Sequence, residues 1–252
     1  MPLTAVSRAI DVLDALGAAP EGVELRGLAA TVGMSPSGAY RTLQTLVAGG
    51  LATQDGKRGL YRLGPKVLLL ARSMRSEAAL LAASEASLHA LSRTIGETVA
   101  LAVLRDRRIW SIASVDGGGE IVARPRLAHG EPYLHNTGRG KLYLAHLPRA
   151  EGVAILAETG LPKIGPHTIT DVAALWQEVE RVRRQGYASN REERSAGLGG
   201  VAVPIFDPDG ALMATLGITV PIFTLSQDRE RELAGHGSAA AREIERRLCG
   251  EA

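Results

Sequence analysis

Polar side chains that could read DNA bases recur at helical spacing within residues 35–48, SPSGAYRTLQTLVA. Arg41 can donate two hydrogen bonds to guanine, and Gln44 can bond to both edge groups of adenine. Ser35 stands where the helix should begin, a position suited to a phosphate contact. The residues of this segment that we predict to contact DNA are Ser35, Ser37, Gly38, Tyr40, Arg41, Gln44 and Thr45.

A basic loop, DGKRG, follows this segment at residues 55–59. It joins two strand-like pieces, 51–54 and 60–63, so we predict a β-hairpin with a basic tip. Lys57 and Arg58 at the tip could neutralise charge on the DNA backbone or in the minor groove.

The elements that must position these groups are short helices. Apolar residues recur at three- and four-residue steps over 4–16, 25–32 and 36–48, and glycines end each stripe. Two short helices joined by a glycine-containing turn and followed by a basic hairpin are typical of a winged helix-turn-helix. Each polar residue taken alone could simply face solvent on a small helical domain. The complete arrangement is what indicates DNA binding.

The charge is distributed unevenly, with nine Lys and Arg against five Asp and Glu in residues 1–75, and twenty against twenty-two in the rest. A basic end on a near-neutral body favours a nucleic-acid-binding module there. Cys249 is the single cysteine, which excludes an internal disulfide and a cysteine-based metal cluster and fits a reducing cytosol. The sequence shows neither a signal peptide nor an apolar run of about 20 residues. We therefore expect a cytoplasmic protein without a membrane partner.

A second candidate binding feature is the run 138–141, GRGK. Glycines leave backbone N–H groups free, and a helix that starts there adds positive potential, so a carboxylate could dock. The alternative is that these glycines only make a tight strand-to-helix turn. The histidines show no metal-ligand spacing with nearby carboxylates, so we expect no metal and no cofactor.

The rest of the chain predicts a second, larger domain. A helical stretch over 66–94 leads into it; β-like segments lie at 98–104, 109–115, 201–206 and 211–220, and helical segments at 138–147, 149–159, 171–185 and 226–248. Strands and helices are mixed without strict alternation, which favours an α+β sheet domain. We expect a winged helix over 1–64, a linker helix over 65–78 and the second domain over 79–252.

Long motifs give the chain a resemblance to the isocitrate-lyase-regulator (IclR) family of bacterial transcription factors. In the first domain the resemblance rests on SRAIDVLDAL, LAATVGMSPSGAYRTLQTLVAGGL and YRLGPKVLLL. In the second it rests on GETVALAVL, LHNTGRGKLYLA, GYASNREERSAGLGGVAVPIFDPDG and the closing ITVP. It covers nearly the whole chain.

The resemblance implies a winged helix-turn-helix joined by a linker helix to a GAF/profilin-like effector-binding domain with an antiparallel sheet. It also implies homodimers that can pair into homotetramers, binding to double-stranded promoter DNA, and repression or activation in response to a small metabolite, often a carboxylic acid. By motif position, the residues implied to bind the effector are Thr137, Gly138, Gly140, Lys141, Asn190, Glu192, Gly200, Val201, Ala202 and Thr219.

Two departures limit this transfer, because many members have cysteine where this chain has Gly200 and alanine where it has Asn136. The identity of the ligand is therefore not carried over. The low aromatic content, 4%, favours a small polar acid over a large aromatic one.

Two other functions compete with this interpretation. An enzyme would need a nucleophile, a redox cysteine or a paired acid and base, and neither a nucleophile elbow nor a Walker-type loop is present, so no catalytic residue is predicted. A DNA-binding protein whose second domain only oligomerises stays open, since Gly200 departs from the common pattern.

Overall fold

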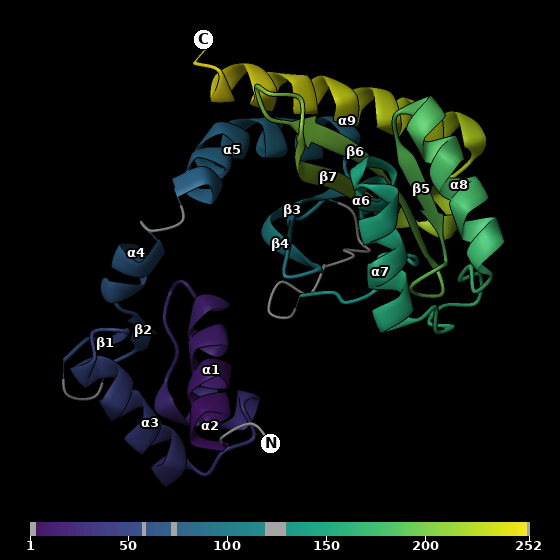
Figure 1. Cartoon of the computed structure of the whole chain (residues 1–252). Coiled ribbons are helices and arrows are strands. Elements are labelled where there is room, and N and C mark those ends of the chain that lie inside the picture. The colour runs from purple at the N-terminus through teal and green to yellow at the C-terminus, as the bar shows by residue number, and fades with distance from the viewer. Residues whose placement is uncertain (1–3, 57–58, 72–74, 119–129, 251–252) are drawn as a thin grey trace. The chain divides into compact units, whose positions relative to one another are not determined.

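The computed structural model describes residues 4–56, 59–71, 75–118 and 130–250. The chain divides into two units, Met1–Ala78 and Ala79–Ala252 (Figure 1). Two residues predicted to contact DNA, Lys57 and Arg58, lie outside the described residues.

Three helices build the core of the first unit. They are α1 (Thr4–Gly17), α2 (Leu25–Thr31) and α3 (Pro36–Ala48). Their inward apolar residues form one cluster, which includes Val12, Leu28 and Leu43. The turn between α2 and α3 requires Gly33, whose φ of 63° lies in the left-handed region that glycine adopts without strain. The helix-turn-helix is present, and α3 begins and ends at the predicted residues.

A small antiparallel hairpin follows α3. Its strands are β1 (Ala52–Gln54) and β2 (Tyr61–Leu63), each one residue shorter than predicted. Val23, between α1 and α2, adds a bridge, because its N–H and carbonyl both bond to Tyr61, at 3.0 and 2.9 Å. This bridge, which the sequence pattern did not indicate, ties the wing to the helices.

The second unit is built on a five-stranded antiparallel sheet in the order β4-β3-β7-β6-β5. The strands are β3 (Thr98–Arg105), β4 (Arg108–Val115), β5 (Ala188–Arg191), β6 (Leu198–Phe206) and β7 (Leu212–Pro221). Antiparallel neighbours throughout confirm the predicted α+β class.

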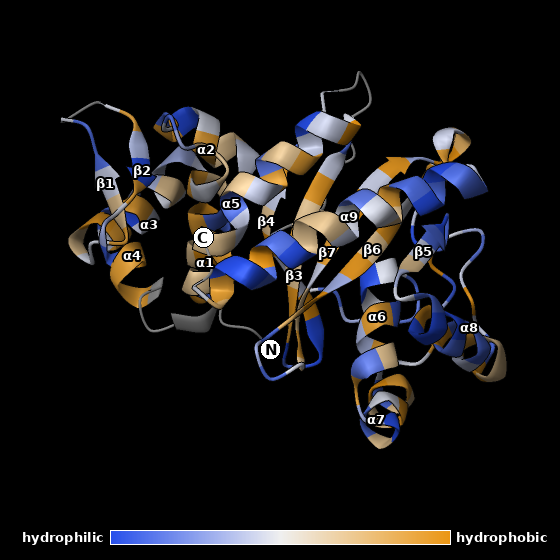
Figure 2. Ribbon diagram, turned by 90° about the horizontal axis from the view of Figure 1, so that it is seen from above, coloured by the Kyte–Doolittle hydropathy of each residue, from blue (hydrophilic) through white to orange (hydrophobic). Residues whose placement is uncertain are grey.

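Helices cover both faces of this sheet (Figure 1). Five helices and one short 3-10 turn take part: α5 (Arg75–Ile95), α6 (Gly138–His146), α7 (Arg149–Thr159), α8 (Val172–Gln185), α9 (Gln227–Leu248) and η1 (Ile222–Thr224). Alternate β6 residues such as Val201 and Val203 pack toward α5 and α9, whereas Ala202 faces α6 and α8. Figure 2 shows hydrophilic and hydrophobic residues alternating along α9, as expected of a helix with one face on the sheet.

The helical stretch expected over 66–94 contains α4 (Lys66–Ala71) and α5, and residues 72–74 lie outside the described part of the chain. Strand β5 was not predicted, because its four residues, ASNR, carry no apolar alternation. Within the described part of the chain, no helix is long and apolar enough to cross a membrane.

Candidate functional site

Helix α3 presents a polar face that is open to solvent. The predicted contact residues Ser37, Tyr40, Arg41, Gln44 and Thr45 are all exposed, and Gly38 is half-buried. The opposite face is fully buried at Ala39 and Leu43. The helix is thus anchored along one side, and its polar side is free to enter a DNA groove.

Side-chain hydrogen bonds within α3 limit what two of these residues can offer. Ser35 caps the helix, because its Oγ accepts a hydrogen bond from Gly38 N at 3.2 Å. The Thr45 hydroxyl donates to the carbonyl of Arg41 at 3.0 Å. Thr45 therefore has only a lone pair and a methyl group to offer to a base edge.

The Arg41 side chain has no hydrogen-bond or ion-pair partner among the described residues, so its guanidinium is available to DNA. In the wing, by contrast, Arg62 is engaged. It pairs with Asp55 and donates to the carbonyl of Glu21 at 2.7 Å. Arg62 therefore braces the hairpin, and its role was not predicted from the sequence.

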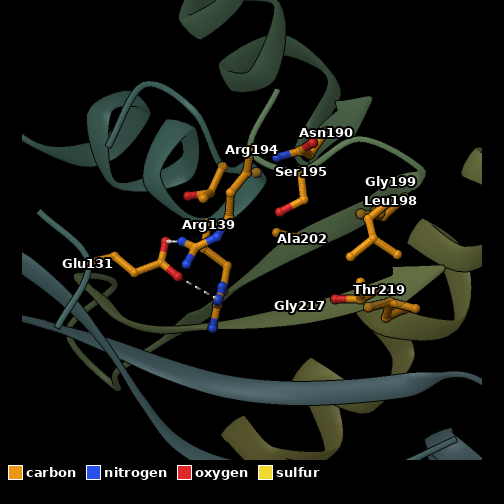
Figure 3. Close-up of a pocket in the computed structure, with 15 residues that line it drawn as sticks. Glu131, Arg139, Asn190, Arg194, Ser195, Leu198, Gly199, Ala202, Gly217 and Thr219 are labelled. Carbon is orange, nitrogen blue, oxygen red and sulfur yellow. Dashed lines mark ion pairs between the residues drawn. The ribbon is translucent and has the colours of Figure 1, made fainter. Parts of the chain in front are cut away.

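A cavity of about 230 Å³ lies in the second unit, between α6, the loop after β5 and the strands β6 and β7 (Figure 3). Seven of the residues implied to bind an effector line it: Thr137, Gly138, Asn190, Gly200, Val201, Ala202 and Thr219. The lining also includes Glu131, Arg139, Arg194, Ser195, Leu198, Gly199, Gly217 and Ile218, which the resemblance did not supply.

The first turn of α6 forms one wall of the cavity. Thr137 caps the helix, its Oγ1 accepting from Gly140 N at 3.0 Å. The N–H groups of a first helical turn lack intrahelical acceptors, and the helix dipole places positive potential there. The GRGK run thus makes a tight turn and also starts a helix at a cavity, and the docking of a carboxylate there stays a prediction.

Two arginines bring positive charge to the same cavity. Arg139 donates to Ser111 Oγ at 2.6 Å, and its Nη2 lies 3.9 Å from Glu131 Oε1. Arg194 pairs with the other Glu131 oxygen. Burial lowers the pKa of Arg139, but a guanidinium stays protonated near neutral pH. Two cations against one carboxylate favour a negatively charged ligand.

Small residues and free hydroxyls complete the cavity. A Cβ at Gly217 would lie 3.1 Å from Arg139 Cδ, so the glycine lets the arginine cross the sheet. The hydroxyls of Ser195 and Thr219 have no hydrogen-bond partner in the described part of the chain and can bind a ligand. The Asn190 amide is committed elsewhere, because it donates to Asn136 O at 2.8 Å and accepts from Glu193 N at 3.2 Å.

Three residues implied to bind the effector do not line the cavity. Gly140 permits close packing, since a Cβ there would lie 2.2 Å from Leu134 O. Glu192 has a φ of 57° and accepts from Gly197 N at 2.8 Å, which closes the loop that carries Arg194. Both residues support the wall of the cavity from behind.

Lys141, the third, is buried in a charge network. Its Nζ lies 2.7 Å from Glu193 Oε1 and 3.1 Å from Glu178 Oε1, and its side chain is 1% exposed. Burial alone would raise the pKa of Glu178, but Arg181 and Lys141 outweigh it and lower that pKa to about 2. For Glu193, burial prevails over Lys141 and raises the pKa. Lys141 thus ties α6 to α8 and to the residue before Arg194.

Of the cavity residues missing from the sequence prediction, Arg139 carried a signal, because it lies within the GRGK run. Glu131 and Arg194 carried none, because they lie far apart in the sequence and nothing in the pattern indicates that they meet. No cluster of His, Cys, Asp or Glu suited to a metal is found within the described residues.

Comparison with known proteins agrees with this geometry. Residues 73–246 match the family model of the bacterial transcriptional regulator IclR C-terminal domain, and residues 5–56 match that of the IclR helix-turn-helix domain. The chain is 32% identical to the HTH-type transcriptional regulator KdgR of Escherichia coli K12 over 242 residues, covering 96% of this chain and 91% of KdgR.

Solved structures show the same fold. The Thermotoga maritima IclR structure has a TM-score of 0.74 at 28% identity and covers 96% of this chain and 98% of its own. An IclR homolog from Microbacterium hydrocarbonoxydans, solved with 4-hydroxybenzoate, has a TM-score of 0.72 at 24% identity and covers 98% of this chain and 100% of its own. These relatives are regulators rather than enzymes. The chain belongs to the IclR family of bacterial transcriptional regulators, with a DNA-binding helix-turn-helix domain and an IclR C-terminal domain.

Proposed function

We propose that this protein is a cytoplasmic, homodimeric regulator whose affinity for promoter DNA is set by a small organic acid bound in the cavity of the second unit. The observation that carries the proposal is the convergence of Arg139, Arg194 and the first turn of α6 on one cavity. Charge-assisted bonds from arginine to a carboxylate are among the stronger hydrogen bonds in proteins.

The size and lining of the cavity favour a short aliphatic acid. Its volume of about 230 Å³ is below the roughly 300–1,000 Å³ of drug-sized ligand sites. No aromatic side chain lines it among the described residues, whereas Leu198 and Ala202 offer small apolar contacts. An acid of this kind would place its carboxylate at the arginines and its short chain against Leu198.

DNA recognition is assigned to the exposed face of α3 in the major groove. Arg41 and Gln44 would bond to base edges, and Ser35, Ser37 and Tyr40 would contact the backbone or flanking bases. Lys57 and Arg58 remain proposed wing contacts.

Three consecutive leucines of α4 support dimer formation. Leu68, Leu69 and Leu70 are 71%, 63% and 57% exposed, unusually open for such side chains. Burying them against a second copy removes this apolar surface from water. A dimer would match a palindromic operator with half-sites about 34 Å apart.

The acid can change DNA affinity only through different affinities for two arrangements of the protein. A direct test is thermal unfolding with a panel of C2–C6 mono- and dicarboxylates and their primary amides. Stabilisation by an acid but not by its amide supports the proposal. Operators would be selected from a random duplex library, and the active acid would then be titrated against that complex.

The competing function, a second domain that only oligomerises, predicts a different outcome. No panel member would then shift the unfolding temperature or the affinity for the selected DNA.

A further inference from the structure

Glu131 is the one carboxylate among the described residues that line the cavity, and it stands between the two arginines (Figure 3). Its Oε1 lies 3.9 Å from Arg139 Nη2, and its other oxygen pairs with Arg194. The side chain is 11% exposed. The two guanidiniums that would hold a ligand carboxylate are thus already in contact with a carboxylate of the protein.

The Arg139 side chain and the backbone beside Arg194 are held by contacts that do not involve Glu131. Arg139 is anchored by its 2.6 Å bond to Ser111 and by its path over Gly217. Arg194 directly follows Glu193, which Lys141 holds at 2.7 Å. If the Glu131 carboxylate moved away, Arg139 would keep its bond to Ser111, Arg194 would keep its place in the loop after β5, and both guanidiniums would need a new anion.

The backbone of Glu131 is fixed at the rim of the sheet. Its N–H and carbonyl exchange hydrogen bonds with Ile109 of β4, both at 2.9 Å. The carboxylate is therefore tethered beside the arginines and acts at a high effective concentration without a second molecule.

We propose that Glu131 is a built-in competitor of the effector: it occupies the arginine pair when the cavity is empty, and the effector carboxylate displaces it. This inference rests on the proposed organic-acid effector. Two carboxylates that share the same guanidiniums repel each other, so effector binding requires Glu131 to give up its ion pairs.

The exchange has two consequences for sensing. The affinity of the protein for its effector is lower than it would be if Glu131 did not compete for the two arginines. A response therefore needs a higher effector concentration. The exchange also discriminates by charge, because a neutral analogue such as an amide cannot replace the carboxylate at the arginines. The ligand class is a small mono- or dicarboxylate.

The test compares the wild-type protein with Glu131→Gln, using isothermal titration of the full-length protein with each carboxylate and amide of the panel. Glutamine keeps the shape of the side chain but removes its charge. We expect Glu131→Gln to bind the active carboxylate at least about tenfold more tightly. The reason is that removing the Glu131 charge frees both guanidiniums for the ligand, and an ion pair about 4 Å apart near a protein surface is worth more than a tenfold change in affinity. The amide should show no such gain.

The control for net charge is Glu158→Gln, which removes an equally charged partner of Arg107 on the exposed surface. It should leave the affinity unchanged. Should Glu131→Gln fail to fold, Glu131→Asp retains the charge on a shorter side chain, cannot reach both arginines, and should show a smaller gain in affinity.

The outcomes separate this inference from the proposed function. A carboxylate that binds Glu131→Gln as well as or more weakly than wild type contradicts the competitor role and leaves the organic-acid effector standing. Binding to Glu131→Gln alone supports the competitor. Binding to neither contradicts both ideas.

Discussion

The exposed face of α3 and the cavity beside α6 handle charge in opposite ways. On α3, Arg41 projects into solvent without a described partner, ready for DNA. In the cavity, Arg139 and Arg194 are engaged by Glu131, and behind the wall Lys141 is engaged by Glu178 and Glu193. An open charge costs little in water, whereas a buried one must be paired. The arginine on the DNA-binding face can therefore stay without an ion-pair partner, whereas the arginines of the cavity need a carboxylate of the protein as partner.

The largest expected effect comes from breaking the buried network with Lys141→Met. The substitution leaves the buried Glu193 without its cation and leaves Glu178 with Arg181 alone, and we expect a loss of about 3–5 kcal/mol in the free energy of unfolding of the second unit. Both tryptophans, Trp110 and Trp176, lie in this unit, so their fluorescence during urea unfolding reports on it alone.

The matched control is Lys163→Met, at an exposed position, which should change stability by less than about 0.5 kcal/mol. Adding Glu193→Gln to Lys141→Met should restore part of the loss, because it removes one of the stranded charges. An equal effect of both lysine substitutions would contradict the distinction between buried and open charges.

Arg41→Ala should have the opposite effect to Lys141→Met: it should weaken the discrimination between DNA sequences and leave the free energy of unfolding unchanged. Loss of a bidentate base contact should cost about 1–3 kcal/mol in discrimination between the selected operator and altered sequences. Titration of labelled duplexes at two salt concentrations measures it. Unfolding should match wild type, because Arg41 has no described partner to lose.

Arg242→Ala is the control for this experiment, since it removes the same charge from an exposed position on α9. It should leave operator preference intact. If both variants lose preference equally, α3 does not read bases through Arg41.

How far the sequence could predict each region follows from the same contrast. The exposed face of α3 is a local property, since the apolar period of one helix fixes which side is buried and leaves the polar side outward. The cavity is assembled from the region of Glu131, the start of α6, the loop after β5, and the strands β6 and β7. No local period connects these segments.

Arg139 and Lys141 show where sequence reasoning ended. Residues two apart in a helix point to nearly opposite sides. Arg139 therefore faces the cavity while Lys141 faces α8, and the motif alone did not say which of them meets a ligand. The family resemblance supplied Lys141 and left out Arg139, because the position of a residue in a motif does not tell which way its side chain points.

The caps of α3 and α6 should each contribute a smaller amount to stability, one in each unit. Ser35→Ala and Thr137→Ala each remove a side-chain cap and should each cost about 1 kcal/mol. Tryptophan fluorescence should detect only the loss at Thr137, so Ser35→Ala must be followed by far-UV circular dichroism. Ser35→Ala should also weaken DNA binding, and Thr137→Ala effector binding. The opposite assignment would contradict the division of function between the two units.

The smallest expected effect is a pH dependence of the stability of the second unit. His135 is fully buried, its Nε2 lies 3.1 Å from the carbonyl of Pro162, and burial lowers its pKa below the ordinary 6.5. The folded state therefore favours the neutral ring, and the unfolded state binds more protons as the pH falls through 6.5. The stability of the second unit should be complete above that pH and decline as the pH drops toward the lower folded-state pKa.

Urea midpoints from tryptophan fluorescence at pH 7.5 and pH 5.5 measure this decline. His135→Gln should show a smaller difference between the two conditions than wild type, because the group that gains a proton on unfolding is gone. His236→Gln, at an exposed position on α9, should behave as wild type. An unchanged difference in His135→Gln would mean that groups other than His135 set the acid sensitivity of this unit. The α3 face has no buried titratable side chain among its contact residues, so no equivalent term is expected there.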